Sequence, residues 1–238
     1  MIQPGIRIIV SGSFILTLLA CSAGVRQKVN VYPDDQPREQ RSEVKDSTRF
    51  FPRDGKYTSW YESGEERTTG EYRNGLKIGL WITRYKSGRL MEWQDYVDGE
   101  LHGLSVSYYE NRNKKHEGRL SHDKRHGWWR TWYENGNLKE ESAYRNDLRH
   151  GVTAYWHENG RKKEELQYVS DLLHGSYVAW WENGLRKAEG RFEYGKRDGL
   201  WTIWDDLGLP LATERYAKGE LLSDTTITSG AAQVSEKP

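Results

Sequence analysis

Aromatic and β-branched residues alternate with polar residues over short runs along most of the chain, and the alternation restarts at a fixed interval. From residue 55 onward, glycine occurs at every twenty-fourth position, and a fixed period of this size indicates a repeat architecture. We number the positions of each repeat from this glycine, which is position 1. The seven glycines are Gly55, Gly79, Gly103, Gly127, Gly151, Gly175 and Gly199.

Each repeat predicts a β-hairpin, because two alternating runs are separated by a turn signal. Positions 9 and 10 are Asn-Gly in three repeats, and this dipeptide is typical of a two-residue type I′ turn, in which both central residues have positive φ. Asn74-Gly75 and Asp98-Gly99 predict turns at the opposite end of the strands. No proline occurs between residues 53 and 209, as strands that donate every ladder hydrogen bond require. The three Asn-Gly pairs are Asn135-Gly136, Asn159-Gly160 and Asn183-Gly184.

A two-residue turn at positions 9 and 10 determines the register of the two strands. Position 6 then faces position 13, which sets Trp132 across from Lys139, and position 4 faces position 15. Position 3 faces position 16, so that Tyr177 covers the bare backbone of Gly190. Cross-strand pairs of these kinds stabilise antiparallel strands by roughly 0.2–1 kcal/mol each.

Seven hairpins in series predict an all-β fold, an elongated and twisted single antiparallel meander over residues 54–222. Open sheets rarely exceed about 10 strands without curling, so we expect strong twist or coiling. Asp205 and Pro210 in the last repeat are typical of a protected sheet edge.

The segments outside the repeats carry different signals. Residues 1–20 combine Arg7 with an apolar run, as a secretory signal does, and they end in a sequence that resembles a bacterial lipobox, Leu18-Leu19-Ala20-Cys21. That resemblance implies cleavage before Cys21 and lipid attachment to it; the alternative is an ordinary signal peptide. Residues 21–53 predict a flexible tether, and residues 223–238 a disordered tail.

Composition sharpens this picture. The mean hydropathy is −0.94 and 30% of residues are charged, yet the chain contains 11 Trp and 15 Tyr. Disordered chains are poor in aromatic residues, so the polar average describes a thin sheet with little aliphatic core. The net charge of +1 gives no basic face for nucleic acid, and a single cysteine excludes a disulfide framework.

The repeat itself resembles a known family. The run from Gly127 to Gly136, followed by Lys139 and Tyr144, is similar to the bacterial MORN repeat variant, found in proteins called YwqK-type antitoxins. The resemblance covers residues 55–222. It implies a non-catalytic repeat protein that binds a partner, and in the antitoxin version that partner is a toxin.

Four histidines at position 24 suggest a metal ladder, but equivalent positions in successive hairpins lie about 9.5 Å apart, too far to share one zinc ion. We therefore expect histidines that lie in turns, and no metal.

The run from Gly190 to Lys196 imitates a phosphate-binding loop, but Arg197 stands where Ser or Thr would hold magnesium, so no cofactor is expected. The carboxylates recur with the repeat, as on a solvated sheet face, and no catalytic motif is present. The chain is thus not expected to be an enzyme. The four position-24 histidines, which suggested a metal ladder, are His102, His126, His150 and His174.

The aromatic residues at position 6 form a candidate interaction surface. Either coiling and Lys side chains cover such residues, or exposed Trp and Tyr recognise a partner, because these residue types are enriched in binding hot spots. The expected partner is a protein, and the alternative is a glycan stacked on coplanar exposed rings.

We expect a lipid-anchored protein of the bacterial cell envelope, at the outer membrane or periplasmic face. The sequence leaves the partner, the functional face and the oligomeric state open. The candidate residues are Trp60, Tyr108, Trp132, Trp156, Trp180 and Trp204.

Overall fold

The computed structural model describes the backbone of residues 8–11, 15–18, 25–31, 37–44, 54–228 and 231–236, and the side chains of residues 54–227. Every secondary-structure element in these ranges is a β-strand. The strands that precede the repeats are β1 (Ile8–Ser11), β2 (Ile15–Leu18), β3 (Val25–Val31) and β4 (Pro37–Val44). Cys21 lies outside the described residues, and the signal peptide, lipid anchor and tether stay predictions.

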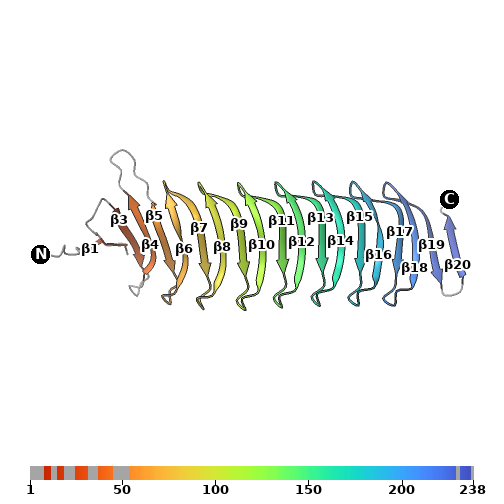
Figure 1. Cartoon of the computed structure of the whole chain (residues 1–238), viewed down its shortest axis with the longest axis horizontal. Coiled ribbons are helices and arrows are strands. Elements are labelled where there is room, and N and C mark those ends of the chain that lie inside the picture. The colour runs from red at the N-terminus through yellow and green to blue at the C-terminus, as the bar shows by residue number, and fades with distance from the viewer. Residues whose placement is uncertain are drawn as a thin grey trace. The chain divides into compact units, whose positions relative to one another are not determined.

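The chain forms two compact units, which we describe separately. The first comprises residues 1–113 and 120–123, and the second residues 114–119 and 124–238. Within each unit, consecutive strands pair antiparallel with their neighbours in sequence (Figure 1), which confirms the predicted all-β hairpin-repeat meander. The repeat strands that lie in the first unit are β5 (Gly55–Trp60), β6 (Glu66–Arg73), β7 (Leu76–Arg84), β8 (Leu90–Val97) and β9 (Glu100–Tyr108). The later strands are β10 (Lys114–Ser121), β11 (Lys124–Trp132), β12 (Leu138–Arg145), β13 (Leu148–Trp156), β14 (Lys162–Val169), β15 (Leu172–Trp180), β16 (Arg186–Glu193), β17 (Lys196–Trp204), β18 (Pro210–Ala217), β19 (Glu220–Thr228) and β20 (Ala231–Glu236).

The hairpin loops at positions 8–10 differ from the prediction. The Tyr133 amide donates to the Asn137 carbonyl at 2.8 Å, and the Gly136 amide donates to the Tyr133 carbonyl at 3.0 Å, so three residues form the loop. Gly136 has φ of 93°, whereas Asn135 is not among the residues with positive φ. This is a type I turn followed by a left-handed glycine, and the predicted two-residue type I′ turn is wrong. The Asn135 side chain favours this form, because its Oδ1 accepts the Asn137 amide at 2.9 Å.

The longer loop changes the register near the turn only. Position 4 pairs with position 15 and position 3 with position 16, as predicted. Position 6 pairs with position 12, because a bulge lies between Thr131 and Trp132, and the predicted pair of Trp132 with Lys139 is wrong. Lys139 instead lies over the Tyr133 ring, at 5.5 Å from its centroid.

The opposite ends of the strands carry the tight turns. Asn74 and Gly75 have φ of 52° and 79°, and Asp98 and Gly99 have 49° and 90°, which confirms turns at these dipeptides. Both central residues are left-handed, as in a type I′ turn.

The position-1 glycines belong to strand bulges. Between β12 and β13 the register passes from Ser142 paired with Thr153 to Tyr144 paired with Arg149, and His150 and Gly151 lie in the gap. The prediction that the position-24 histidines lie in turns is therefore wrong, because each strand begins two residues earlier. Among the described residues, no group of three or more His, Cys, Asp or Glu could hold a metal ion.

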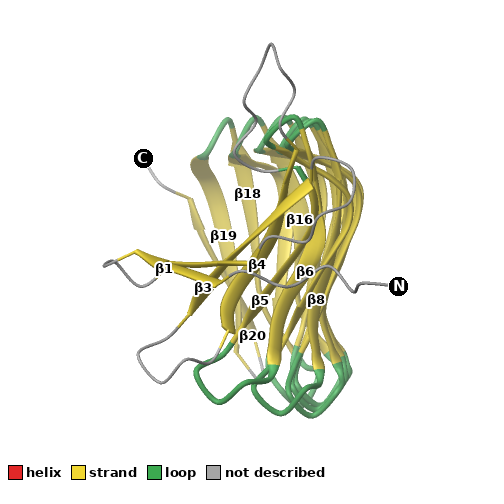
Figure 2. Ribbon diagram, turned by 90° about the vertical axis from the view of Figure 1, so that its left-hand side faces the viewer, coloured by secondary structure: helices red, strands yellow, loops and turns green. Residues whose placement is uncertain are grey.

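One face of the sheet holds most of the buried side chains. We call it the core face; it carries positions 3 and 5 of one strand and positions 14, 16 and 18 of the next. Trp201, at position 3, is 1% exposed and packs edge-on against Phe192, with ring centroids 5.0 Å apart. The strands bow along their length (Figure 2). The core is therefore a layer of side chains on a single sheet, with no second layer of secondary structure over it in the described chain.

Glycines at position 16 let this layer pack tightly. A Cβ atom added to Gly190 would lie 2.3 Å from the Trp201 ring, and Gly70 and Gly118 meet Trp81 and Trp129 in the same way. Tyr177 does pair with Gly190, as predicted, but the ring that covers the glycine comes from the following strand.

The last repeat extends beyond residue 222, where the sequence places its end. β19 runs to Thr228, and its Thr225 and Thr226 pair with Thr213 and Ala212 of β18. The β-branched threonines explain the extension, since they fit a strand better than a disordered tail.

Candidate functional site

Position 7 connects successive repeats by a side-chain hydrogen bond. The Tyr133 hydroxyl donates to the carbonyl of Trp156 in the next repeat at 2.8 Å. In earlier repeats, the Tyr61 hydroxyl donates to the Arg84 carbonyl and the Tyr85 hydroxyl to the Tyr108 carbonyl in the same way. Position 7 then changes to His157, whose Nε2 lies 3.1 Å from the Trp180 carbonyl. A carbonyl only accepts, so Nε2 carries the proton.

The hydrogen-bonded series continues through a larger side chain in the next repeat. The Trp181 indole Nε1 donates to the Trp204 carbonyl at 3.2 Å, which holds this ring over the core face. Position 7 of the last repeat is Asp205, whose Oδ1 accepts the amides of Leu207 and Leu209 in its own loop.

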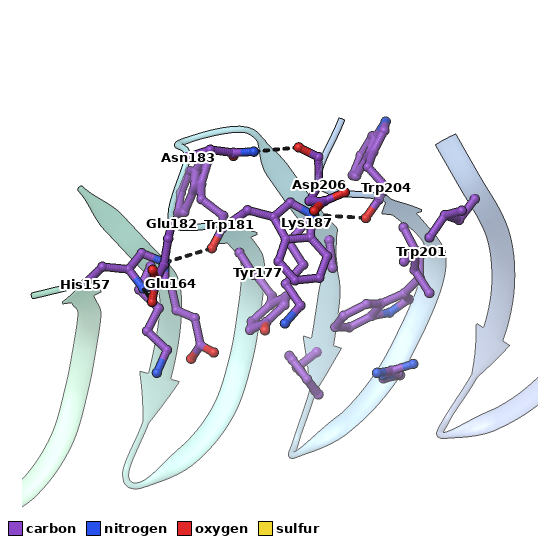
Figure 3. Close-up of a pocket in the computed structure, with 18 residues that line it drawn as sticks. His157, Glu164, Tyr177, Trp181, Glu182, Asn183, Lys187, Trp201, Trp204 and Asp206 are labelled. Carbon is purple, nitrogen blue, oxygen red and sulfur yellow. Dashed lines mark hydrogen bonds and ion pairs between the residues drawn. The ribbon is translucent and has the colours of Figure 1, made fainter. Parts of the chain in front are cut away.

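A groove of about 1020 Å³ opens on the core face where position 7 changes (Figure 3). Its floor includes Ala179 of β15 and Ala188 of β16, which are cross-strand partners. The preceding hairpin pairs Tyr155 with Glu164 at the same two positions. Two small side chains in place of two large ones create the hollow.

Aromatic side chains surround this floor. Tyr177 and Trp201, at position 3, line the groove with ring centroids 5.2 Å apart and planes inclined at 32°. Trp181, at position 7, also lines it, and Figure 3 shows Trp181 on the side nearer the hairpin loops. All of these residues belong to the second unit.

The groove carries charges of both signs. Lys187 Nζ lies 4.2 Å from the centroid of the Trp181 ring, and the Arg197 guanidinium lies 4.3 Å from that of Trp201. Glu164 also lines the groove, and together burial and this carboxylate raise the pKa of the Tyr177 hydroxyl.

The comparisons with known proteins bear on the repeat. Residues 125–146, which include β12 and most of β11, match the family model described as the MORN repeat variant. The chain therefore carries a MORN-type repeat. No curated protein matches the chain.

Similar solved structures add no argument about the function of the MORN-type repeats. A crystal structure of TcdB2-TccC3-Cdc42 has a TM-score of 0.25 and 9% identity, and the match covers 93% of this chain and 14% of that one. A porin-like protein from Bacteroides uniformis has a TM-score of 0.20 and 8% identity, with 96% and 91% covered. The chain thus spans a small part of the first of these structures.

The six aromatic residues predicted from position 6 are all half-buried. The carbonyls of four of them, Tyr108, Trp156, Trp180 and Trp204, accept the position-7 hydrogen bonds. Trp180 and Trp204 line the groove. Tyr108 lines a separate hollow in the first unit, together with Arg112. A role of the whole set in binding stays a prediction.

Sequence reasoning missed the groove itself. Its signal was present, because position 7 is Tyr in the first four repeats and then becomes His157, Trp181 and Asp205. Position 14 likewise changes from Glu164 to Ala188. Deviations from the repeat mark the site, whereas its most regular positions do not.

Among the described residues, no helix has the length and apolar content that crossing a membrane requires.

Proposed function

We propose that this chain is a non-catalytic β-repeat scaffold that binds another protein through the groove between β14 and β18. One observation carries the proposal. A single groove of about 1020 Å³ combines aromatic walls with charges of both signs. Aromatic side chains and partly desolvated charges are typical of protein-binding hot spots. A MORN-type repeat fits a non-catalytic repeat protein.

The full proposal includes the location and the partner class. Lipid attachment at Cys21 would hold the repeats at the cell envelope, and a toxin that the chain neutralises is the partner class implied by the resemblance. Exchange of Cys21 for alanine should then release the chain from membranes, as measured by fractionation. Continued retention would contradict the anchor.

The arrangement of the rings does not favour a glycan. Sugar stacking needs solvent-facing, coplanar rings, whereas Trp201 is 1% exposed and inclined to its neighbour Tyr177 by 32°. Lys187 and Arg197 lie over the Trp181 and Trp201 rings, so part of the aromatic surface is already covered.

A groove-filling variant tests the protein-binding role. Ala188→Glu places in the groove a side chain that the fold carries at position 14 of the two preceding repeats, as Glu140 and Glu164. Ala212→Glu makes the same exchange at position 14 of the next repeat, whose residue does not line the groove. Co-purification from the native envelope should recover a specific protein with the wild type and with Ala212→Glu, but not with Ala188→Glu. Recovery of no specific protein by the wild type would refute the proposal.

A further inference from the structure

One carboxylate in the groove lacks an internal partner. Glu140, at position 14 of the fourth repeat, accepts the Ser142 hydroxyl at 2.6 Å. Glu164 occupies the same position in the fifth repeat, but Leu166 replaces the serine and supplies no donor. Within residues 54–227 no hydrogen bond or ion pair holds the half-buried Glu164 carboxylate. Partial burial of such a group is costly unless a partner compensates it.

Two of the three Lys and Arg residues that line the groove are engaged elsewhere. Arg197 Nη1 lies 3.2 Å from the Glu214 carboxylate and 3.0 Å from the Tyr216 hydroxyl, and its guanidinium stacks on Trp201. Lys187 extends over the Trp181 ring. Lys163 is the third, and none of the three lies within 4.0 Å of the Glu164 carboxylate, so this carboxylate has no ion-pair partner among the described groove residues.

Aromatic rings beside a free carboxylate suit a planar cation. A guanidinium can stack on an aromatic face and at the same time donate two hydrogen bonds to one carboxylate. Tyr177 lies near enough to Glu164 to feel its charge, and it lines the groove together with Trp181.

The rim next to the groove is apolar. Four leucines around the last two hairpin loops are exposed, and one of them, Leu211, lines the groove. Leu185 contacts the last loop, since a Cβ atom on Gly208 would lie 3.4 Å from its Cδ1. The fourth and fifth repeats carry Asn, Arg or Lys at the positions of these four leucines. The four leucines are Leu185, Leu207, Leu209 and Leu211, which we call the leucine rim.

We propose that the groove receives an arginine side chain of a partner protein, flanked in that partner by aliphatic residues. The guanidinium pairs with Glu164 and stacks on Tyr177 and Trp181, and the aliphatic neighbours lie on the leucine rim. This inference rests on the proposed protein-binding function and names the chemistry that the groove selects.

Selection from a random linear peptide library displayed on phage tests the proposal. The full chain in mild detergent is the target, with Glu164→Gln and Glu140→Gln as parallel targets that keep the side-chain size. We expect peptides with arginine between aliphatic residues to be enriched on the wild type and on Glu140→Gln, but not on Glu164→Gln. Circular dichroism of each target checks that it is folded.

Affinities of one enriched peptide give the decisive measurement. Glu164→Gln should weaken binding roughly tenfold, and replacing the peptide arginine by glutamine should weaken binding to the wild type equally. The two changes together should cost little more than either alone, because both remove the same pair.

Three outcomes would overturn the proposal. Peptides that need Trp181 but contain no arginine would refute it and leave protein binding intact. A lack of any enriched peptide would refute it as well, and co-purification with the Ala188→Glu variant would then decide the proposed function separately. Self-association that sedimentation detects and Glu164→Gln abolishes would assign the groove to a second copy of the chain.

Discussion

The packing of Trp201 on Gly190 makes a quantitative prediction about stability. In Gly190→Ala the added methyl group would lie 2.3 Å, 2.4 Å and 2.7 Å from three ring atoms of Trp201. The ring cannot easily withdraw, because Phe192 and Tyr177 lie 5.0 Å and 5.2 Å away and Trp201 is 1% exposed. A strand or loop must therefore shift.

The magnitude follows from two opposing effects. Overpacking of this kind costs about 1–3 kcal/mol, and the confinement of the ring favours the upper end. Replacing glycine by alanine in a strand otherwise stabilises it by about 0.5–1 kcal/mol. We therefore expect Gly190→Ala to lower the free energy of unfolding by about 2 kcal/mol.

A double-mutant cycle separates the clash from other effects. Trp201→Thr installs the residue that Thr153 provides at the same position of the fifth repeat, so the background is compatible with the fold. In that background Gly190→Ala should be neutral or slightly stabilising, because the ring is absent. Urea denaturation followed by circular dichroism gives the four free energies. An equal cost of Gly190→Ala in both backgrounds would refute the packing argument.

Three further substitutions test separate features. Tyr133→Phe should lower the free energy of unfolding by about 1 kcal/mol, because it leaves the Trp156 carbonyl without its donor, whereas Tyr194→Phe at an exposed ring should have no effect in the same urea titration. Arg112→Gly should stabilise the chain by about 1 kcal/mol, since Arg112 has φ of 77° where most repeats carry glycine; a lower urea midpoint would contradict this. Burial raises the pKa of Tyr155 to about 12, so the unfolded state loses this proton first and stability should fall between about pH 10 and pH 12. Tyr155→Phe should reduce that fall, and an unchanged pH profile would contradict the assignment.

The fold could be predicted from the sequence because the same 24-residue hairpin pattern occurs seven times. The spacing alone placed the hairpins, and the pairing of position 3 with position 16 followed from placing the turn at positions 9 and 10. The turn type could not be predicted, because Asn-Gly suits a type I′ turn and also a type I turn that ends in a left-handed glycine. The Asx bond from Asn135 to the Asn137 amide selects the second form.

The ring-on-glycine packing was present in the sequence but assigned to the wrong strand. Gly70, Gly118 and Gly190 each precede a tryptophan by 11 residues, whereas Ser142 precedes Thr153 at the same spacing. Only the pairing between successive hairpins brings these residues together, so an argument confined to one hairpin chose Tyr177.

The groove was missed because it depends on two small residues whose importance appears only in space. Ala179 and Ala188 lie opposite each other across β15 and β16, and the walls of the hollow come from other positions of the repeat. Position 6, which the sequence analysis chose as the interaction surface, is half-buried. Its backbone carbonyls accept hydrogen bonds that connect successive repeats, as Trp156 does from Tyr133.

The last hairpin shows why the leucine rim requires an explanation beyond the hairpin itself. In earlier loops an asparagine at position 9, such as Asn183, stabilises the turn by accepting the amide two residues on. In the last loop Asp205 takes over, since its Oδ1 accepts the Leu207 and Leu209 amides at 3.0 Å and 2.7 Å. Position 9 is thus released from its structural task, yet it carries Leu207, which is 76% exposed. A loop that needs no leucine and exposes it beside three other exposed leucines and an aromatic groove fits a protein-binding rim, because clustered exposed apolar side chains mark interaction sites.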